Sequence, residues 1–360
     1  MHHLPGAGAA VAGIRLSLTA LLPTMALGGL LAGCFALPRL AGLPLQHLTN
    51  LHALWGMAGW VGLLVVGIAF QVVPMFMLTE PYPARLTGTY SAAPFLLLAA
   101  TSLSSGWQGI GQLVHLGCVV LLSGGYALFA GTTLALLLRR KRPRADPTTL
   151  YWRAAMASLL ASLSLWLGIS LGPEMGNAPP LALGVLLIGG VFLSAINGML
   201  YKIAPFLCWY HLQKLRPASG RKPPGIGQFV PERQAQWQFA LHAAGVVLLT
   251  AGCYLHPLVR PGAALLCLAC PAMAANLGNA ARLHWRERAA GCAASLPAST
   301  LMPPTTFSCK RPNRVRPICN NSYPLPMAGP IRPKSAGYGP GSPAPARTPP
   351  PPRSRPRPAA

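Results

Sequence analysis

Residues 181–196 read LALGVLLIGGVFLSAI, a stretch that is apolar on every side and contains no charged side chain. A helix of about 20 such residues crosses a hydrocarbon core of about 30 Å. A strand of a membrane barrel would instead alternate apolar and polar residues over about ten positions. Similar apolar runs recur between residues 13 and 282 with short breaks. The sequence therefore predicts an all-α bundle of membrane-spanning helices.

The composition excludes an ordinary soluble protein. Only 9% of the 360 residues are charged and 52% are hydrophobic, whereas a soluble domain has about a quarter of its residues charged. The net charge of +24 would suit nucleic acid, but the basic residues cluster in a few loops and in the C-terminal tail, with none forming an aromatic-interleaved binding face. We therefore expect contact with the lipid bilayer and none with nucleic acid.

The apolar runs and the breaks between them predict about eight spans. Their expected positions are residues 13–37, 51–77, 88–105, 110–138, 152–171, 181–209, 236–255 and 259–281. Lys and Arg accumulate in cytoplasmic loops, and the two richest loops follow the fourth and the sixth span. Both termini are therefore predicted to lie inside, in the cytoplasmic (inner) membrane of a bacterium.

The sequence divides near residue 290. Residues 1–290 carry the predicted bundle, whereas residues 291–360 are rich in Pro, Arg, Ser and Ala and contain no acidic residue. Such a segment buries too little apolar area to offset its ordering entropy, so we predict a disordered basic tail. Its charge suits the anionic inner leaflet. An out-of-frame reading of a GC-rich gene has the same composition, and we assign the tail no functional residue.

Ionisable side chains are rare inside the predicted spans. All five carboxylates fall in loops or at span ends, which argues against an ion-coupled pump or symporter, because such proteins generally hold the ion on an intramembrane carboxylate. Lys202 is the one clear cation inside a span. Its position near the cytoplasmic end favours an anchor that reaches the headgroups over a buried site. The nine cysteines, including the CxxC of Cys267 and Cys270, predict no disulfide framework.

Two pairs of histidines are candidate ligands, because neutral imidazole commonly binds haem iron and copper. His52 begins the second span and His115 lies early in the fourth, so both are expected near the outer face. His211 and His242 are expected near the inner face. Either pair could hold a haem or a copper ion. The alternative is that these are ordinary interfacial residues.

The surroundings of His52 favour a haem. Gly56 and Gly59 lie four and seven residues later on the same helix face, which would leave room for a flat macrocycle beside the imidazole. Trp55 and Trp60 would supply aromatic walls. The alternative interpretation is close helix packing, because small residues let membrane helices approach one another.

Two further segments end long spans at the inner face. Residues 71–76 read QVVPMF and residues 197–206 read NGMLYKIAPF. Proline removes a helical hydrogen bond, so each span should kink about a turn before the cytoplasm. Gln71, Asn197 and Tyr201 could line a polar cavity there together with the freed carbonyls. Simple kinks filled by neighbouring helices are the alternative.

Residues 51–60, LHALWGMAGW, and residues 71–76 together resemble a haem-binding helix of subunit I in the haem–copper oxidase superfamily. With residues 197–211 and 239–242, the chain resembles bacterial membrane proteins related to that subunit over about residues 50–285. The resemblance implies that His52 is a haem ligand, with His115 or His242 as its partner. The predicted spans contain no adjacent His–His pair like that of the oxidase copper site, so oxygen reduction is not expected.

Three functions remain open. They are a haem- or copper-binding protein related to respiratory electron transfer, a small-molecule permease, and an assembly partner of respiratory membrane proteins. Whether the protein is an enzyme is left undecided, and no catalytic residue is assigned. A permease is expected to show internal duplication, and no clear repeat is visible in the sequence.

Overall fold

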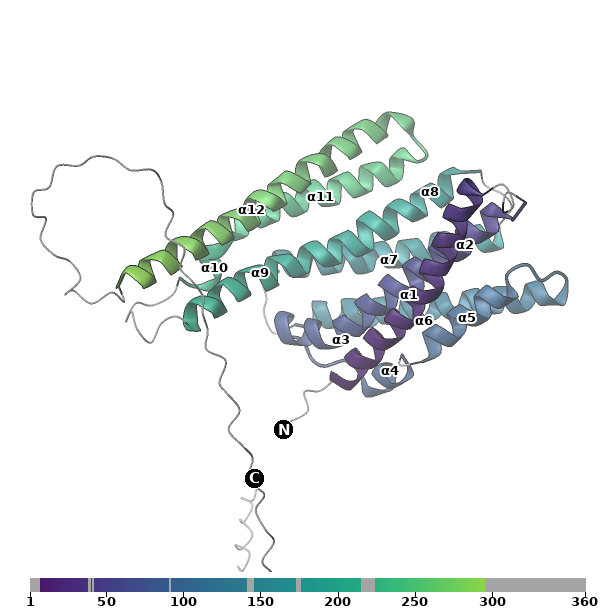
Figure 1. Ribbon diagram of the computed structural model, residues 1–360, viewed down its shortest axis with the longest axis horizontal. Coiled ribbons are helices and arrows are strands. Elements are labelled where there is room, and N and C mark those ends of the chain that lie inside the picture. Colours follow the sequence, from purple (N-terminus) through teal and green to yellow (C-terminus); the bar gives the residue numbers. More distant parts are fainter. Residues whose placement is uncertain are drawn as a thin grey trace, which may run out of the picture. The chain divides into compact units, whose positions relative to one another are not determined.

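The regular elements of the described chain are all helices. The computed structural model describes residues 7–37, 40, 42–90, 92–140, 146–172, 176–214 and 224–294 (Figure 1). The all-α prediction is confirmed for these residues. The last described helix continues to Ala294, and residues 295–360, which hold nearly all of the predicted tail, lie outside the described part.

The helices follow one another as two series. The first series is α1 (Ala7–Ala36), α2 (Leu45–Leu54), η2 (Trp55–Gly62), α3 (Leu63–Met77), α4 (Ala84–Thr89), α5 (Ala93–Ser104) and α6 (Ile110–Leu138). The second series is α7 (Pro147–Leu171), α8 (Ala178–Val185), η3 (Leu186–Leu193), α9 (Ser194–Lys214), α10 (Ile226–Phe229), α11 (Glu232–Gly252), η4 (His256–Leu258) and α12 (Val259–Ala294). Elements α2, η2 and α3 form one continuous helix with a π-helical middle, and so do α8, η3 and α9.

Six of these helices are long and apolar enough to cross a membrane, so the chain is a multi-pass integral membrane protein. They are Gly8–Ala36, Leu45–Met77, Ile110–Leu138, Pro147–Leu171, Ala178–Lys214 and His256–Ala290. Large apolar side chains on them are exposed, among them Leu22, Leu121 and Ile188. Lipid tails, unlike water, are a favourable environment for such surfaces.

The prediction of eight spans is not confirmed, because two of the expected helices fall short. Helix α5 has 12 residues and reaches about 18 Å at about 1.5 Å per residue, less than the hydrocarbon core of about 30 Å. Helix α11 has 21 residues, but Glu232, Arg233 and Gln236 make its first turns polar. Helix α5 precedes the last long helix of the first series, and α11 precedes the last long helix of the second.

The two series are copies of one structural unit. Each π-helical segment is eight residues long, and each is followed at the same spacing by a proline, Pro74 or Pro205. The expectation of no clear repeat was therefore wrong. The identical counterparts lie 131 residues apart and are Gly59 and Gly190, Gly67 and Gly198, and Pro74 and Pro205. Gly and Pro are common in membrane helices, which conceals this pattern in the sequence.

The shared glycines make the same contacts in both units. A Cβ atom at Gly67 would lie 3.1 Å from the Cα of Gly13 on α1, and a Cβ atom at Gly198 would lie 2.8 Å from the Cβ of Tyr151 on α7. Gly13 and Tyr151 are 138 residues apart. Two further pairs of contacts repeat at these spacings: Gly67 with Ala10 and Gly198 with Thr148, and Gly59 with Ala20 and Gly190 with Ser158.

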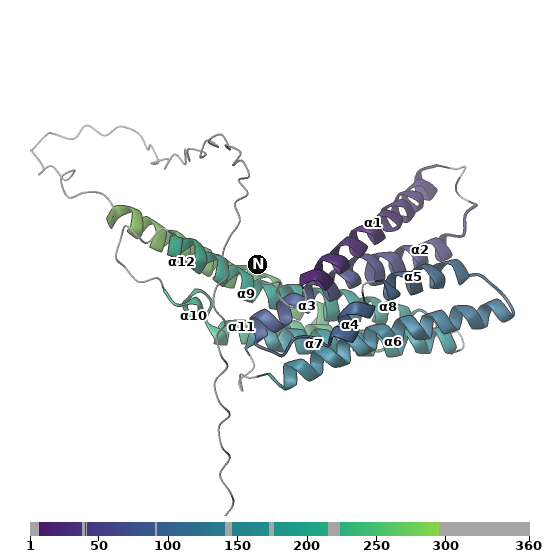
Figure 2. The same ribbon diagram turned by 90° about the horizontal axis from the view of Figure 1, so that it is seen from below.

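The two units run in the same direction. The rings of Phe76, at the end of α3, and Phe206, late in α9, lie 6.1 Å apart, so both proline-containing ends lie at one end of the bundle. We call it the inner end, following the predicted orientation. Helices α6 and α7, which join the units, lie side by side (Figure 2), as do α11 and α12 (Figure 1). Parallel repeats of this kind are related by an axis along the membrane normal.

The centres of the two units differ in chemistry. In the first unit, the ring of Phe70 lies 6.0 Å from that of Tyr90 and 6.1 Å from that of Phe129. In the second unit, Tyr201 lies 131 residues after Phe70, and its hydroxyl is hydrogen-bonded to Gln238 at 3.2 Å and to Asn276 at 2.8 Å. The same backbone arrangement therefore holds an aromatic cluster in one unit and a polar cluster in the other.

The close contact at Gly198 can be tested by adding one methyl group. Gly198→Ala should lower the thermal unfolding midpoint in detergent, because the new methyl would meet Tyr151 at 2.8 Å and overpacking costs about 1–3 kcal/mol. Gly184→Ala on the same continuous helix is the control, since nothing lies within 4 Å of its added methyl. Equal midpoints for the two variants would contradict the proposed contact.

Candidate functional site

Buried polar side chains gather in the second unit. They come from four helices, α7, α9, α11 and α12, and lie between the inner end and the η3 segment. Polar groups inside a membrane protein are costly unless paired and commonly mark functional positions. The residues of this polar network are Tyr151, Ser194, Asn197, Tyr201, Gln238, His242 and Asn276, all buried.

Gln238 is the centre of the network. Its Oε1 accepts hydrogen bonds from the hydroxyls of Tyr151 and Tyr201, the latter at 3.2 Å. Its Nε2 donates to the carbonyl oxygen of Ala269 on α12 at 3.2 Å. Asn276 donates in turn to the Tyr201 hydroxyl at 2.8 Å. One amide therefore ties α7, α9, α11 and α12 together.

His242 forms the deep end of the network. Its Nε2 lies 2.9 Å from the hydroxyl of Ser194, and its ring lies 5.4 Å from the ring of Tyr151. The Ser194 hydroxyl also lies 3.3 Å from the carbonyl oxygen of Gly189 in η3. The wide π-helical turn thus supplies a backbone acceptor to the side-chain network.

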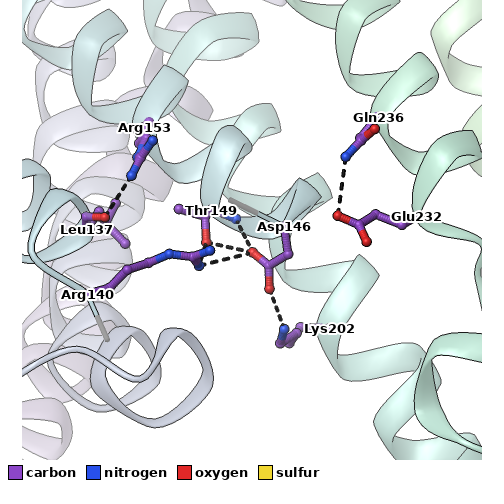
Figure 3. Close-up of polar contacts among 8 residues, drawn as sticks. All are labelled: Leu137, Arg140, Asp146, Thr149, Arg153, Lys202, Glu232 and Gln236. Carbon is purple, nitrogen blue, oxygen red and sulfur yellow. Dashed lines mark hydrogen bonds and ion pairs between the residues drawn. The ribbon is translucent and has the colours of Figure 1, made fainter. Parts of the chain in front are cut away.

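An ion cluster closes the inner end of the same unit (Figure 3). The Lys202 ammonium lies 2.6 Å from one carboxylate oxygen of Asp146, and the other oxygen accepts from the backbone N–H and the hydroxyl of Thr149 at 2.9 and 2.6 Å. Arg140 donates to the Thr149 hydroxyl at 2.5 Å. The lysine side chain is 26% exposed and is held by Asp146, so it does not extend free of the protein, and its role as a headgroup anchor stays a prediction.

Asp146 begins α7 and stays charged at neutral pH. Burial would raise the pKa of this carboxyl, but hydrogen bonds from Lys202 and Thr149 and the charge of Lys202 outweigh burial and lower its pKa below the ordinary value. A lowered pKa means that the stabilisation is complete above the unfolded value of about 3.9 and is lost as pH falls through the folded value. We therefore expect the cluster to be intact from mildly acidic to neutral pH.

Together the ion cluster and the network form a polar column. On α9 alone, eight residues separate Lys202 from Ser194, which corresponds to about 12 Å along the helix. The column therefore reaches from the inner end well into the apolar layer and ends at His242. Groups in it can bind a hydrogen-bonding solute or pass a proton, and they offer both donors and acceptors.

The predicted outer histidines are held on separate helices. The Nδ1 of His52 lies 3.0 Å from the carbonyl oxygen of Thr24 on α1, and the Nδ1 of His115 lies 3.1 Å from that of Thr101 on α5. His115 also lies 3.1 Å from the Ser104 hydroxyl. Each ring is half-buried and oriented by a neighbouring helix.

The glycine face beside His52 does not fit a haem. A Cβ atom at Gly59 would lie 2.8 Å from Leu98 and 3.1 Å from Ala20, and one at Gly56 would lie 3.4 Å from Thr24. Neighbouring helices therefore fill the space expected for a macrocycle, as in the alternative interpretation of close helix packing.

The predicted inner histidines do not form a pair. His211 is exposed and its ring lies 6.3 Å from that of His284, whereas His242 is buried against Ser194. Asn197 and Tyr201 do belong to the polar network, with Asn197 beside Tyr151. Gln71 is half-buried in the first unit, at the position that Lys202 occupies in the second.

Several network residues were not predicted, although one signal was available. Gln238 lies four residues before His242 and hence on the same helix face. That spacing indicates a polar stripe on α11. Tyr151, Ser194 and Asn276 lie on three different helices far apart in the sequence, and only the structure brings them together.

Comparison of the chain with family models, curated proteins and solved structures finds no match. The resemblance to haem–copper oxidase subunit I therefore stays a prediction. Among the described residues, no group of three or more His, Cys, Asp or Glu side chains could hold a metal ion. The polar column is thus the candidate site that the geometry itself defines.

The ion pair can be tested by removing its acid. Asp146→Asn should lower the free energy of unfolding by about 1–3 kcal/mol, because Lys202 loses its partner while it stays largely buried. The measurement is a denaturation midpoint in detergent, repeated in a Lys202→Met background. In the Lys202→Met background, Asp146→Asn should lower the free energy of unfolding by a smaller amount. An equal cost in both backgrounds would show that the two residues are not coupled.

Proposed function

We propose that the protein is a permease of the bacterial cytoplasmic membrane that passes a small neutral solute through its second unit. The observation that carries this proposal is the polar network around Gln238. It places hydrogen-bonding side chains from four helices where the first unit has an aromatic cluster. The fold does not need a network that joins four helices, since the centre of the first unit is an aromatic cluster with isolated hydrogen bonds such as that between Tyr82 and Thr133.

The chemistry of the network favours a neutral solute. Its groups are two phenols, three amides, a hydroxyl and an imidazole. The described residues of the network include no carboxylate. Ion-coupled transport generally requires an intramembrane carboxylate. Amides and phenols instead offer donors and acceptors together, which suits uncharged molecules such as polyols or amides.

The duplication supports transport as well. Many carriers consist of repeats, and parallel repeats related by an axis along the membrane normal are one of the two arrangements. Here the repeats are unequal, because polarity is concentrated in the second. The first unit then acts as a scaffold, and the solute path lies along α9.

The helix that carries the site is interrupted on both sides of it. Network residues 194–201 lie between the π-helical segment η3 and Pro205. π-Helical turns are frequent at functional sites, and proline removes a backbone hydrogen bond. These two places let the intervening segment tilt without unfolding the helix, which is the kind of movement that alternating access needs.

Transport can be measured by light scattering of proteoliposomes exposed to glycerol or urea. Wild type should shrink and reswell faster than empty liposomes. Gln238→Leu should lower the solute flux about tenfold or more, because a hydrogen bond lost from a polar path is worth about 1.4 kcal/mol. Tyr126→Phe, which removes a buried hydroxyl group from the first unit, should leave the flux unchanged. Wild-type flux equal to that of empty liposomes, for both probes, would overturn the proposal.

A second candidate is a haem- or copper-binding protein related to respiratory electron transfer, with copper fitting better than haem because neighbouring helices fill the glycine face beside His52. One observation favours it. A carbonyl oxygen only accepts, so the Nδ1 atoms of His52 and His115 carry the proton, and each Nε2 keeps its lone pair. Histidine ligands are commonly oriented in this way.

Metal binding can be tested by an optical spectrum of the purified protein, reduced minus oxidised, with copper analysis. Binding through these rings predicts a haem band or about one copper ion per chain that is lost in His52→Ala and His115→Ala. His47→Ala is the control. A flat spectrum without copper would exclude this candidate and leave the permease proposal untouched.

A further inference from the structure

The ion cluster contains guanidinium groups whose donors are not all used. The side chain of Arg140 is 3% exposed. Its Nη1 donates to Thr149 and lies 3.6 Å from Asp146. Within the described part of the chain, its Nε and Nη2 are buried without any hydrogen-bond partner.

Arg153, one turn after Thr149 on α7, also has a guanidinium donor that is not used. Its Nη2 donates to the carbonyl oxygen of Leu137 at 2.9 Å, which caps the end of α6. Its Nε is buried and has no hydrogen-bond partner among the described residues. Thr149 and Arg153 are four residues apart and therefore lie on one face of α7. Figure 3 shows the Arg140 guanidinium at Thr149 and the Arg153 side chain directed to Leu137, both beside the start of α7.

The charges of the cluster do not balance. Arg140, Arg153 and Lys202 contribute three positive charges, and Asp146 contributes one negative charge. Both oxygens of this carboxylate are already engaged, one by Lys202 and the other by Thr149. Buried donors are almost always paired in folded proteins, and orphans commonly indicate an ion or water that belongs there. For a guanidinium in a cluster with an excess of positive charge, an anion satisfies both the unused donor and the charge.

We propose that Arg140 and Arg153 bind a phosphate group at the junction of α6 and α7. Guanidinium donors match phosphate oxygens in a fork geometry. The site also lies at the N-terminus of α7, a helix of 25 residues, where the helix dipole favours negative charge. Three positive charges and one negative charge leave a net charge of +2, which a singly or doubly charged anion would offset.

Two sources could supply this phosphate. One is the headgroup of an anionic phospholipid in the inner leaflet, for which basic pockets between membrane helices are typical sites. The other is free phosphate or a phosphorylated solute from the cytoplasm. Both depend on the same donors, so the experiment separates them by the form in which the phosphate is offered.

The test measures the thermal midpoint of the full chain in detergent with three additions. These are phosphatidylglycerol, phosphatidylcholine at equal concentration, and inorganic phosphate against chloride. We expect a rise of several degrees with phosphatidylglycerol if a lipid is the source, or with inorganic phosphate if the anion is free. No rise with either addition would overturn the proposal, and so would an equal rise with phosphatidylcholine.

Arginine variants assign the effect to the site. Arg140→Gln should abolish the rise, whereas Arg139→Gln, which removes the same charge from an exposed neighbour, should keep it. Arg153→Lys keeps the charge but removes the Nε donor, and should reduce the rise. This variant decides the outcome if Arg140→Gln does not fold. An unchanged rise in Arg153→Lys and in any folded Arg140→Gln protein would overturn the proposal. Solute flux is not the readout, so the permease proposal stands or falls separately.

Discussion

The structure depends on the close approach of helix backbones at glycine. Lipid tails are as apolar as leucine, so membrane helices gain little from hiding apolar surface and associate through van der Waals contact instead. In each unit the long π-containing helix meets the first helix where a glycine leaves space, at Gly67 and at Gly198. This contact repeats at constant spacing and joins the first two long helices of each unit in the same way. The units differ in the lengths of their later helices and in the side chains at their centres.

The side chains at the centres of the two units differ in polarity. In the first unit, Phe70, Tyr90 and Phe129 fill the centre with edge-to-face and tilted aromatic contacts. In the second unit the centre holds a network in which Gln238 bonds with three other helices. Its polar groups gain little over their hydration in water, but leaving any one unpaired would be costly. The second unit is therefore the more specific and the more easily damaged of the two.

Hydropathy alone predicted the all-helical fold and the six apolar helices, because long uncharged runs permit no other structure in a membrane. The other two predicted spans are not confirmed, since α5 is short and α11 begins with polar turns. The site was harder to predict. Asn197 and Tyr201 were recognised because they adjoin a proline, but Gln238 and Asn276 acquire meaning only when four helices converge. The ion pair of Lys202 was not predicted, because its partner Asp146 lies 56 residues away. A pattern within one helix cannot reveal a partner at that separation.

The π-helical segment η3 gives the site a property that no single side chain has. Residues after it keep their direction toward the interior only because the segment contains its particular number of residues. A π-helical turn holds more residues than an α-helical turn, so this segment sets how the helix before it is rotated relative to the residues after it. Asn197 and Tyr201 follow the segment directly, and their direction toward the network is therefore a property of the backbone as well as of the side chains.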